Sequence, residues 1–308
     1  MMDSWVNIVI RFALYLDLML LFGLPLFGLY ALKHDERRSS RITKQFAVIL
    51  GGAATAGIAL SVLSMIVLAK MMTGEEDYSS VSQHALGMII SGTTLGTAWV
   101  LRLVALVVVL TVTPALLRRP TVGLAAAAIG GAVALASLAW GGHGAMDSGD
   151  KGVIHLSADI LHLAAAGGWI GALTAFVLLL RVDDASPSQR LETLQRTLAG
   201  FAVVGTAIVL TLVATGLINY GMISGPTLSG LTTTLYGQLL LTKLGFFALM
   251  LALAAANRYH LTPRLEAKIR NGDYAGAVGA LRKSLLIESS AATAIIVLVS
   301  VLGIQSPQ

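Results

Sequence analysis

The sequence predicts an all-α membrane protein with eight transmembrane helices, on three observations. Of its 308 residues, 56% are apolar and only 12% are charged, and the mean hydropathy is +0.80. The apolar residues form long runs, and an α-helix needs about 20 such residues to cross the hydrocarbon core of a bilayer. Short charged segments separate the runs. The chain has no cysteine, which excludes disulfides and thiolate chemistry.

Each apolar run is long enough for one crossing of the bilayer. In chain order the predicted spans are Trp5–Leu32, Gln45–Ala69, Thr94–Leu117, Thr121–Trp140, Val153–Leu180, Thr197–Tyr220, Thr234–Arg258 and Ser284–Ile304. Sequence patterns define such ends only to about 2–4 residues. Between the second and third spans, the irregular segment Met71–Thr93 is predicted to contain a short interfacial helix around Ser79–Ile90.

The distribution of basic residues predicts the orientation. The loops after the first, third, fifth and seventh spans together hold sixteen lysines and arginines, whereas the opposite loops hold only Lys70 and Lys151. Because cytoplasmic loops carry the excess of basic residues, both termini are predicted to be periplasmic. The N-terminus lacks a basic segment with a cleavage site, so the first span should be retained. With the charge explained by topology, we expect a lipid bilayer and no nucleic acid as partner.

The chain also resembles itself, which predicts a parallel repeat of four helices plus four. Two segments recur in the same order: "RITKQFAV" (Arg41–Val48) as "RTLAGFAV" (Arg196–Val203), and "TTLGTAWVLR" (Thr93–Arg102) as "TTLYGQLLLTK" (Thr233–Lys243). Four spans return the chain to its starting side, so the halves should be related by an axis along the membrane normal. The predicted divisions are a first unit at 1–140, a periplasmic connecting loop at 141–152 and a second unit at 153–308.

The fifth span carries the most unusual chemistry. His155, Asp159 and His162 are spaced i, i+4 and i+7, so they fall within roughly 60° of arc on one helix face. Placing an ionisable residue at such depth costs free energy, so such residues face the protein interior and often mark an ion or proton pathway. The alternative is that Asp159 balances a cation such as Lys243 while the histidines bond to neighbouring helices. Small residues that allow close helix approach follow at Gly167, Gly168 and Gly171.

Histidine and methionine are concentrated on the predicted outer side. Imidazole and thioether groups are suitable ligands for copper, and thioethers especially for Cu(I). A single methionine is otherwise explained by apolar packing. The resulting candidate metal ligands are His155, His162, His143, Met146, His84 and Asp159.

Further charged residues lie inside the spans. Arg102 and Lys243 occupy matching positions in the two halves, and Asp17 is the candidate equivalent of Asp159. Since a lone buried charge costs several kcal/mol, the two cations are expected to pair with Asp17, Asp159 or helix-end carbonyls. The functional alternative is that they regulate the passage of a cation or proton.

Three polar residues near the predicted inner side form another candidate group. Asn257 and Arg258 end the seventh span, and Glu288 lies near the start of the eighth. They could form an inner gate or a tie between the last two helices, and we favour the tie.

The second half of the chain resembles the copper resistance protein D family (CopD/PcoD). The resemblance is carried by "TTLYGQLLLTKLGFFALMLALAAANRYHLTPRL" (Thr233–Leu265), by "LRKSLLIESSAA" (Leu281–Ala292), and by the histidine-bearing "HLSADILHLAAAGGWIGAL" (His155–Leu173). Such proteins are multi-pass proteins of the bacterial inner membrane associated with copper homeostasis, often acting with the periplasmic carrier CopC. The resemblance implies copper movement from the periplasm towards the cytoplasm, with a separate CopC-like carrier. By position it implies that His155 and His162 are ligands.

The leading hypothesis is therefore a copper transport protein whose outer histidines and methionines capture copper. One alternative is a b-type haem redox protein, with a pair of axial ligands drawn from His84, His143 and His162. Another is a non-transporting membrane partner that docks a copper chaperone. We expect no enzyme, because the sequence contains no nucleophile–base motif, phosphate loop or HExxH site.

Overall fold

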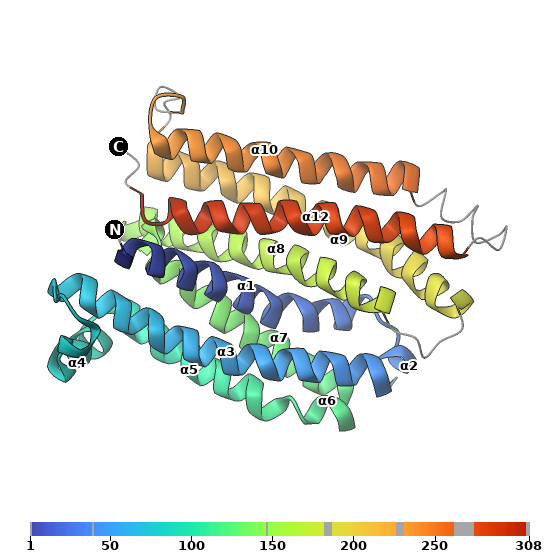
Figure 1. Cartoon of the computed structure of the whole chain (residues 1–308), viewed down its shortest axis with the longest axis horizontal. Coiled ribbons are helices and arrows are strands. Elements are labelled where there is room, and N and C mark those ends of the chain that lie inside the picture. The colour runs from blue at the N-terminus through green and yellow to red at the C-terminus, as the bar shows by residue number, and fades with distance from the viewer. Residues whose placement is uncertain are drawn as a thin grey trace.

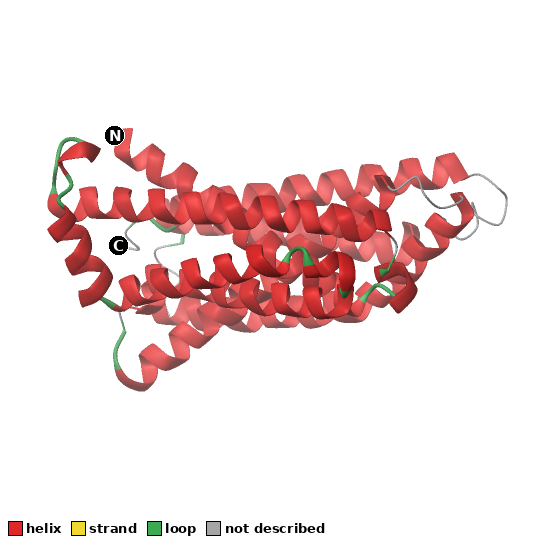
Figure 2. Ribbon diagram, turned by 90° about the horizontal axis from the view of Figure 1, so that it is seen from below, coloured by secondary structure: helices red, strands yellow, loops and turns green. Residues whose placement is uncertain are grey.

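The computed structural model describes residues 2–38, 40–145, 147–181, 187–225, 231–261 and 274–305. Within them, eight helices are long and apolar enough to cross a membrane, and they confirm the eight predicted spans. They run roughly along one axis (Figures 1 and 2). In chain order they are α1 (Met2–Tyr30), α3 (Ser40–Thr73), α5 (Thr94–Val112), α7 (Pro120–Ala136), α8 (Gly149–Arg181), α9 (Pro187–Ser224), α10 (Leu235–Ala256) and α12 (Tyr274–Leu302).

Short elements connect the long helices. They are α2 (His34–Arg37), η1 (Tyr78–Ser80), α4 (Gln83–Gly92), α6 (Ala115–Arg118), η2 (Ser137–Gly141), η3 (His143–Ala145) and η4 (Asn257–Leu261). The helix predicted around Ser79–Ile90 is present as η1 and α4, and the Ser82 side chain caps α4 by accepting from the Ala85 N–H. α4 packs against α3 and α5 at the edge of the bundle (Figure 1).

The same cap starts the third helix of each half. The Thr93 side chain accepts from the Gly96 N–H at the start of α5, and the Thr234 side chain accepts from the Gly237 N–H at the start of α10. A threonine at this position satisfies one of the orphan donors of a helix terminus. The sequence echo therefore has a local structural counterpart, while the duplication as a whole stays a prediction.

Helix α1 is the centre of the bundle, packed against α3, α7, α8 and α12. Its closest approach is to α8, where a Cβ added at Gly23 would lie 1.9 Å from the Gly167 carbonyl oxygen. A Cβ added at Gly171 would lie 2.0 Å from the Gly23 carbonyl carbon. No side chain fits in either place, so glycine is required on both helices. The close approach expected from the glycines of the fifth span is confirmed.

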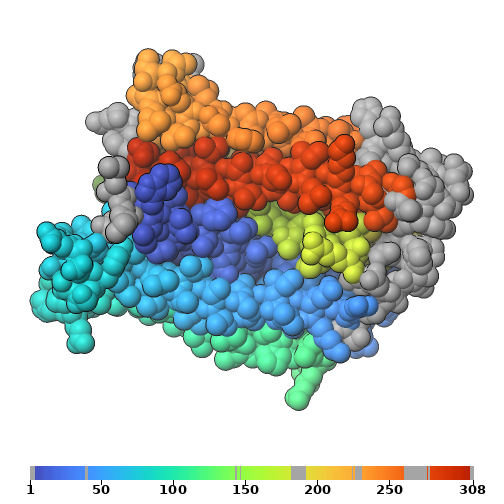
Figure 3. Space-filling model, in the orientation of Figure 1, coloured from blue at the N-terminus to red at the C-terminus, as the bar shows by residue number. Residues whose placement is uncertain are grey.

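The two halves differ in how completely they close. In the first unit (α1, α3, α5 and α7) each helix packs against the next, and α7 returns to α1, forming a closed ring. In the second unit (α8, α9, α10 and α12) α8 packs against α9 and α10 against α12, but α9 and α10 make at most isolated close backbone approaches. α12 lies between α1 and α10 on the face shown in Figure 3. Over the described residues, the second unit is thus least closely packed between α9 and α10.

At the end opposite the two termini (Figure 1), α2 joins the units. Glu36 accepts two hydrogen bonds from the Arg196 guanidinium of α9, at 2.5 and 2.6 Å, and Arg196 also donates to the Ala31 carbonyl at 2.9 Å. Burial acts to raise the pKa of Glu36, but the Lys33 backbone N–H and Arg196 lower it more, and the pKa lies below its ordinary value. Glu36 is therefore ionised at neutral pH and ties the units together.

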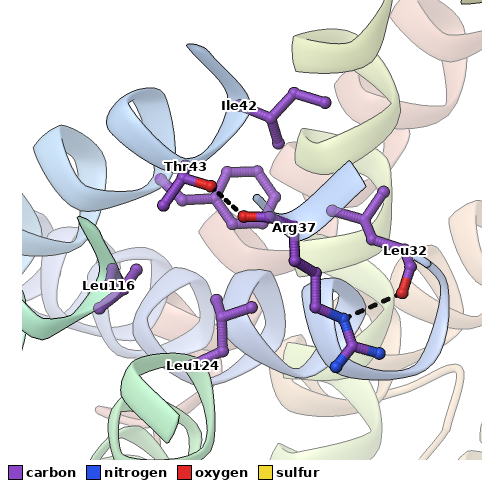
Figure 4. Close-up of a pocket in the computed structure, with 7 residues that line it drawn as sticks. Leu32, Arg37, Ile42, Thr43, Leu116 and Leu124 are labelled. Carbon is purple, nitrogen blue, oxygen red and sulfur yellow. Dashed lines mark hydrogen bonds between the residues drawn. The ribbon is translucent and has the colours of Figure 1, made fainter. Parts of the chain in front are cut away.

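The neighbouring Arg37 holds the turn between α1 and α3. Its Nε donates to the Leu32 carbonyl at 2.9 Å, and its own carbonyl accepts from the Thr43 hydroxyl at 2.5 Å (Figure 4). The side chains of Leu116 and Leu124 complete a small apolar pocket there. Because the guanidinium also bonds to the Leu29 carbonyl, it satisfies carbonyls that the end of α1 leaves unpaired.

Candidate polar site on helix α8

The polar face of α8 meets three other elements. As the spacing predicted, His155, Asp159 and His162 lie on one helix, and each has a partner from outside α8. The partners come from the segment after η3 and from α9, while α10 brings a lysine within electrostatic range. The face therefore lies close to both α9 and α10.

His155 is held by a carboxylate from the connecting loop. The imidazole is only 1% exposed, and its Nδ1 lies 2.7 Å from Oδ2 of Asp147. Since a carboxylate accepts, Nδ1 carries the hydrogen, and in the neutral ring the lone pair is then on Nε2. Nε2 is buried and has no hydrogen-bond partner among the described residues. A carboxylate bonded to one ring nitrogen while the other is free is the usual arrangement of a metal-binding histidine.

The loop backbone covers this histidine and the aspartate one turn further. A Cβ added at Gly144 would lie 2.6 Å from Oδ2 of Asp159 and 3.3 Å from Cδ2 of His155. Cδ2 is bonded to Nε2, so the free nitrogen and the Asp159 carboxylate border the same small region beneath Gly144. Glycine is needed here because any side chain would occupy that region.

His162 lies two turns further along α8, paired with α9. Its Nδ1 is 2.9 Å from the Thr215 hydroxyl, which donates its own hydrogen to the Thr211 carbonyl at 2.6 Å. The hydroxyl must therefore accept from Nδ1–H, and the lone pair of His162 is again on Nε2. Two histidines on one face thus carry the tautomer suited to binding a metal through Nε2.

Asp159 lies between the histidines, surrounded by polar groups. Its Oδ1 accepts from the Asn219 amide of α9 at 2.6 Å. Lys243 and Tyr236 of α10 are both close enough for the charge of Asp159 to act on them, and Lys243 also acts on His162. The predicted balance between Asp159 and Lys243 therefore has a geometric basis.

The corresponding residues of the first unit are arranged differently. Arg102 is buried and donates to the Ser137 hydroxyl at 2.8 Å and to the Ser137 carbonyl at 3.5 Å. This is the helix-end alternative among its predicted partners, because Ser137 directly follows α7. Asp17 is 9% exposed, and its Oδ2 has no hydrogen-bond partner among the described residues.

The other candidate ligands do not extend the cluster. His84 is exposed on α4, which packs against α3 and α5. His143 lies in η3, where the structure describes its backbone but not its side chain, and Met146 lies outside the described residues. Over the described part of the chain, no three histidine or carboxylate side chains form a ready-made metal cage.

The three residues near the predicted inner side do not all come together. Asn257 donates to Glu288, and the Ser284 hydroxyl donates to Asn257 Oδ1 at 2.5 Å, joining the end of α10 to α12. Glu288 is buried, whereas Arg258 is exposed with its guanidinium 5.6 Å from the Tyr259 ring centre. Asn257 opens the π-helical turn η4. The geometry of the first two residues is that of a tie between helices.

Sequence reasoning missed three contributors to the site. Thr215 and Asn219 are spaced i, i+4 on α9, a polar pair in an apolar run that could have been noticed. Asp147 had a weaker signal: an acidic residue in the glycine-containing loop, eight positions before His155. Only the folding of that loop onto α8 shows its role.

Comparisons with known proteins agree with the resemblance noted in the sequence. Residues 1–153 match the family model described as "Copper resistance protein D-like, N-terminal domain", and residues 195–302 match that of "Copper resistance protein D". Copper resistance protein D of Pseudomonas syringae pv. tomato is 45% identical over 307 residues, covering 100% of this chain and 98% of the relative.

A more distant relative is inner membrane protein YebZ of Escherichia coli (strain K12). It is 27% identical over 266 residues, covering 84% of this chain and 85% of the relative. No solved structure matches. Eight apolar helices and a relative named for the inner membrane support a multi-pass inner-membrane location. The chain belongs to the copper resistance protein D family.

Proposed function

We propose that this protein transports copper across the inner membrane, through the polar face of α8 in the second unit. The observation that carries the proposal is the pair of histidines with free Nε2 lone pairs on that face, flanking a carboxylate. Imidazole is a good ligand for copper, and relatives are named for copper resistance. The proposed direction is from the periplasm to the cytoplasm.

His155 is the proposed capture ligand. Its Nε2 and the Asp159 carboxylate lie under the backbone of Gly144, in a loop predicted to face the periplasm. A copper ion delivered by a CopC-like periplasmic carrier would exchange its carrier ligands for these two groups. Asp147 acts on the other ring nitrogen, holding the imidazole in place and raising its basicity.

His162 is the proposed next ligand along the path. It lies seven residues after His155, on the order of 10 Å along the helix axis, so both histidines cannot hold one ion at once. Copper would pass between them along Asp159. The helices α9 and α10, which border this face, pack less closely on each other than successive helices of the first unit do.

Lys243 is the proposed resident counter-ion. In the empty protein its ammonium acts on Asp159 and keeps a buried negative charge from standing alone. An arriving copper ion would take the place of Lys243 as the cation nearest to Asp159, and Lys243 would take that place again when the ion leaves. Asp159 then has a cation beside it at each stage.

The deciding experiment measures copper binding by purified protein and copper accumulation by cells. His155→Ala combined with His162→Ala is expected to lower both strongly, because it removes both proposed ligands. The matched control is His34→Ala, since His34 is exposed on α2. Unchanged binding and accumulation in the double variant would show that the proposed site is wrong.

Purified protein and vesicles that contain it also distinguish copper transport from the haem and docking hypotheses. A Soret absorbance band after haem-replete expression, lost with His162→Ala, would indicate a haem protein instead. Vesicles that bind copper but never accumulate it would indicate a docking partner without transport.

A further inference from the structure

A carboxyl group in the first unit has no role in the proposed copper path. Asp17 lies near the middle of α1, directed towards α3 and α5: a Cβ added at Gly57 of α3 would lie 2.6 Å from its Oδ2, and the nearest Leu106 methyl of α5 3.0 Å from that Cβ. The side chain is 9% exposed. Glycine on α3 thus makes the space that the carboxyl group occupies between three helices.

Asp17 has no cation as a bonded partner among the described residues. The helices that pack against α1, and α5, which borders Asp17 through Leu106, carry these titratable groups away from the first turns and from the ends that adjoin the basic loops: Lys70 near the end of α3, Arg102 on α5, His155, Asp159 and His162 on α8 and Glu288 on α12, with none on α7. Arg102 bonds to Ser137, and Lys70 lies over the Tyr78 ring. On α1 itself, the Arg11 guanidinium lies 5.9 Å from the Tyr15 ring centre.

An ionised carboxylate in this place would be unpaired and largely without water. Burying an isolated charge is far more costly than burying a neutral acid, so this position favours the protonated side chain. The free energy of this site therefore depends on whether that proton stays or leaves.

We propose that Asp17 is a proton-binding site that exchanges its proton when copper occupies the second unit, an inference that rests on the proposed copper path. The physical link is α1, whose backbone meets α8 at Gly23, Gly167 and Gly171. A positive ion on α8 stabilises a negative carboxylate on the adjacent helix. Copper binding then favours Asp17–COO⁻ plus a proton released to water, and by reciprocity proton binding weakens copper binding. For Cu(I) the buried charge is unchanged by the exchange.

The test measures proton release and infrared absorption when copper is added to purified protein at a series of pH values from about 6 to 9, and variants of Asp17 assign the signals. The wild type is expected to release a proton and to lose the carbonyl band of a carboxylic acid. In Asp17→Asn the protein should still bind copper, but the proton and the band change should both be lost. Glu288→Gln is the matched control, because it removes a different buried carboxyl group, and it should keep both signals.

Asp17→Asn could fail to fold, so Asp17→Glu is tested as well. This variant keeps a carboxyl group and should show the same loss of the carboxylic acid band at a shifted frequency. Wild-type protein that binds copper without releasing a proton overturns the proton site and leaves the proposed function standing. The same holds if the band change survives in Asp17→Asn. Absence of copper binding by the wild type overturns the proposed function, and the proton site with it.

Discussion

Replacing Asp147 by Asn tests whether the capture histidine depends on its loop carboxylate. The change keeps the size of the side chain but removes the charge that accepts from Nδ1 of His155 across 2.7 Å. An amide can turn either its oxygen or its NH₂ towards the ring, so the tautomer with a free Nε2 is no longer imposed. We expect weaker copper binding without loss of the fold, because Asp147 is 41% exposed.

The size of the effect follows from the role of the carboxylate. Partners that orient a metal-binding histidine contribute roughly 10–100-fold to metal affinity, equivalent to about 1.4–2.7 kcal/mol. The partial exposure of Asp147 favours the lower half of this range, whereas the near-complete burial of His155 favours the upper half. We therefore expect a loss of about 30-fold.

The assay is a copper titration of purified protein at neutral pH in competition with a chelator of known affinity. Asp150→Asn is the matched control, since Asp150 is an exposed carboxylate in the first turn of α8. His155→Ala sets the lower limit, and Asp147→Asn should change affinity little when added to it. Equal affinities of Asp147→Asn and Asp150→Asn would refute the reasoning, and so would full additivity with His155→Ala.

The remaining predictions concern stability and charge. Gly23→Ala should destabilise the fold by about 1–3 kcal/mol or more, because the new methyl group would overlap a carbonyl of α8. Gly52→Ala, which has open space around it, should be neutral or stabilising. Thermal melting in detergent compares the two variants. Glu36→Gln should cost on the order of 1 kcal/mol at neutral pH, because it breaks a partly buried ion pair, and a double-mutant cycle with Arg196→Gln should be non-additive. Because the native pKa of Glu36 is lowered, the ion pair stabilises the fold fully above the ordinary pKa of about 4.3, and this stabilisation fades as the pH falls through the native pKa. Thermal melting of wild type and Glu36→Gln at several pH values measures it. A stability difference between the two proteins that grows on acidification would contradict the prediction. Lys243→Met should tighten copper binding on the order of tenfold and slow its release, since a competing positive charge is removed; weaker binding would argue against the counter-ion role.

The transmembrane helices could be predicted from sequence because their cause is local. Each span must satisfy its own backbone polar groups inside a helix, and a run of about 20 apolar residues is enough to predict such a span. The same holds for the one-sided face of α8, since His155 and His162 share a face in any helix. Gly167 and Gly171 likewise indicated close approach, but not that Gly23 of α1 is the residue they meet.

The sequence offered several partners across helices but could not choose among them, because the choice depends on which faces meet. Arg102 and Lys243 match in sequence, yet one bonds to Ser137 and the other lies in the field of Asp159. Similarly, Asn257 reaches Glu288 while Arg258, the next residue, turns away to Tyr259. A rotation of one residue, about 100°, decides between these outcomes.

By itself, the sequence determined an eight-helix protein in the lipid bilayer, its polar fifth span and its likeness to copper resistance proteins. Only the tertiary structure decided that the first unit closes while α9 and α10 of the second pack less closely, and that Asp147 folds back onto His155. The physical reason is that burial in lipid acts on each helix alone, whereas packing and hydrogen bonding act between segments far apart in the chain.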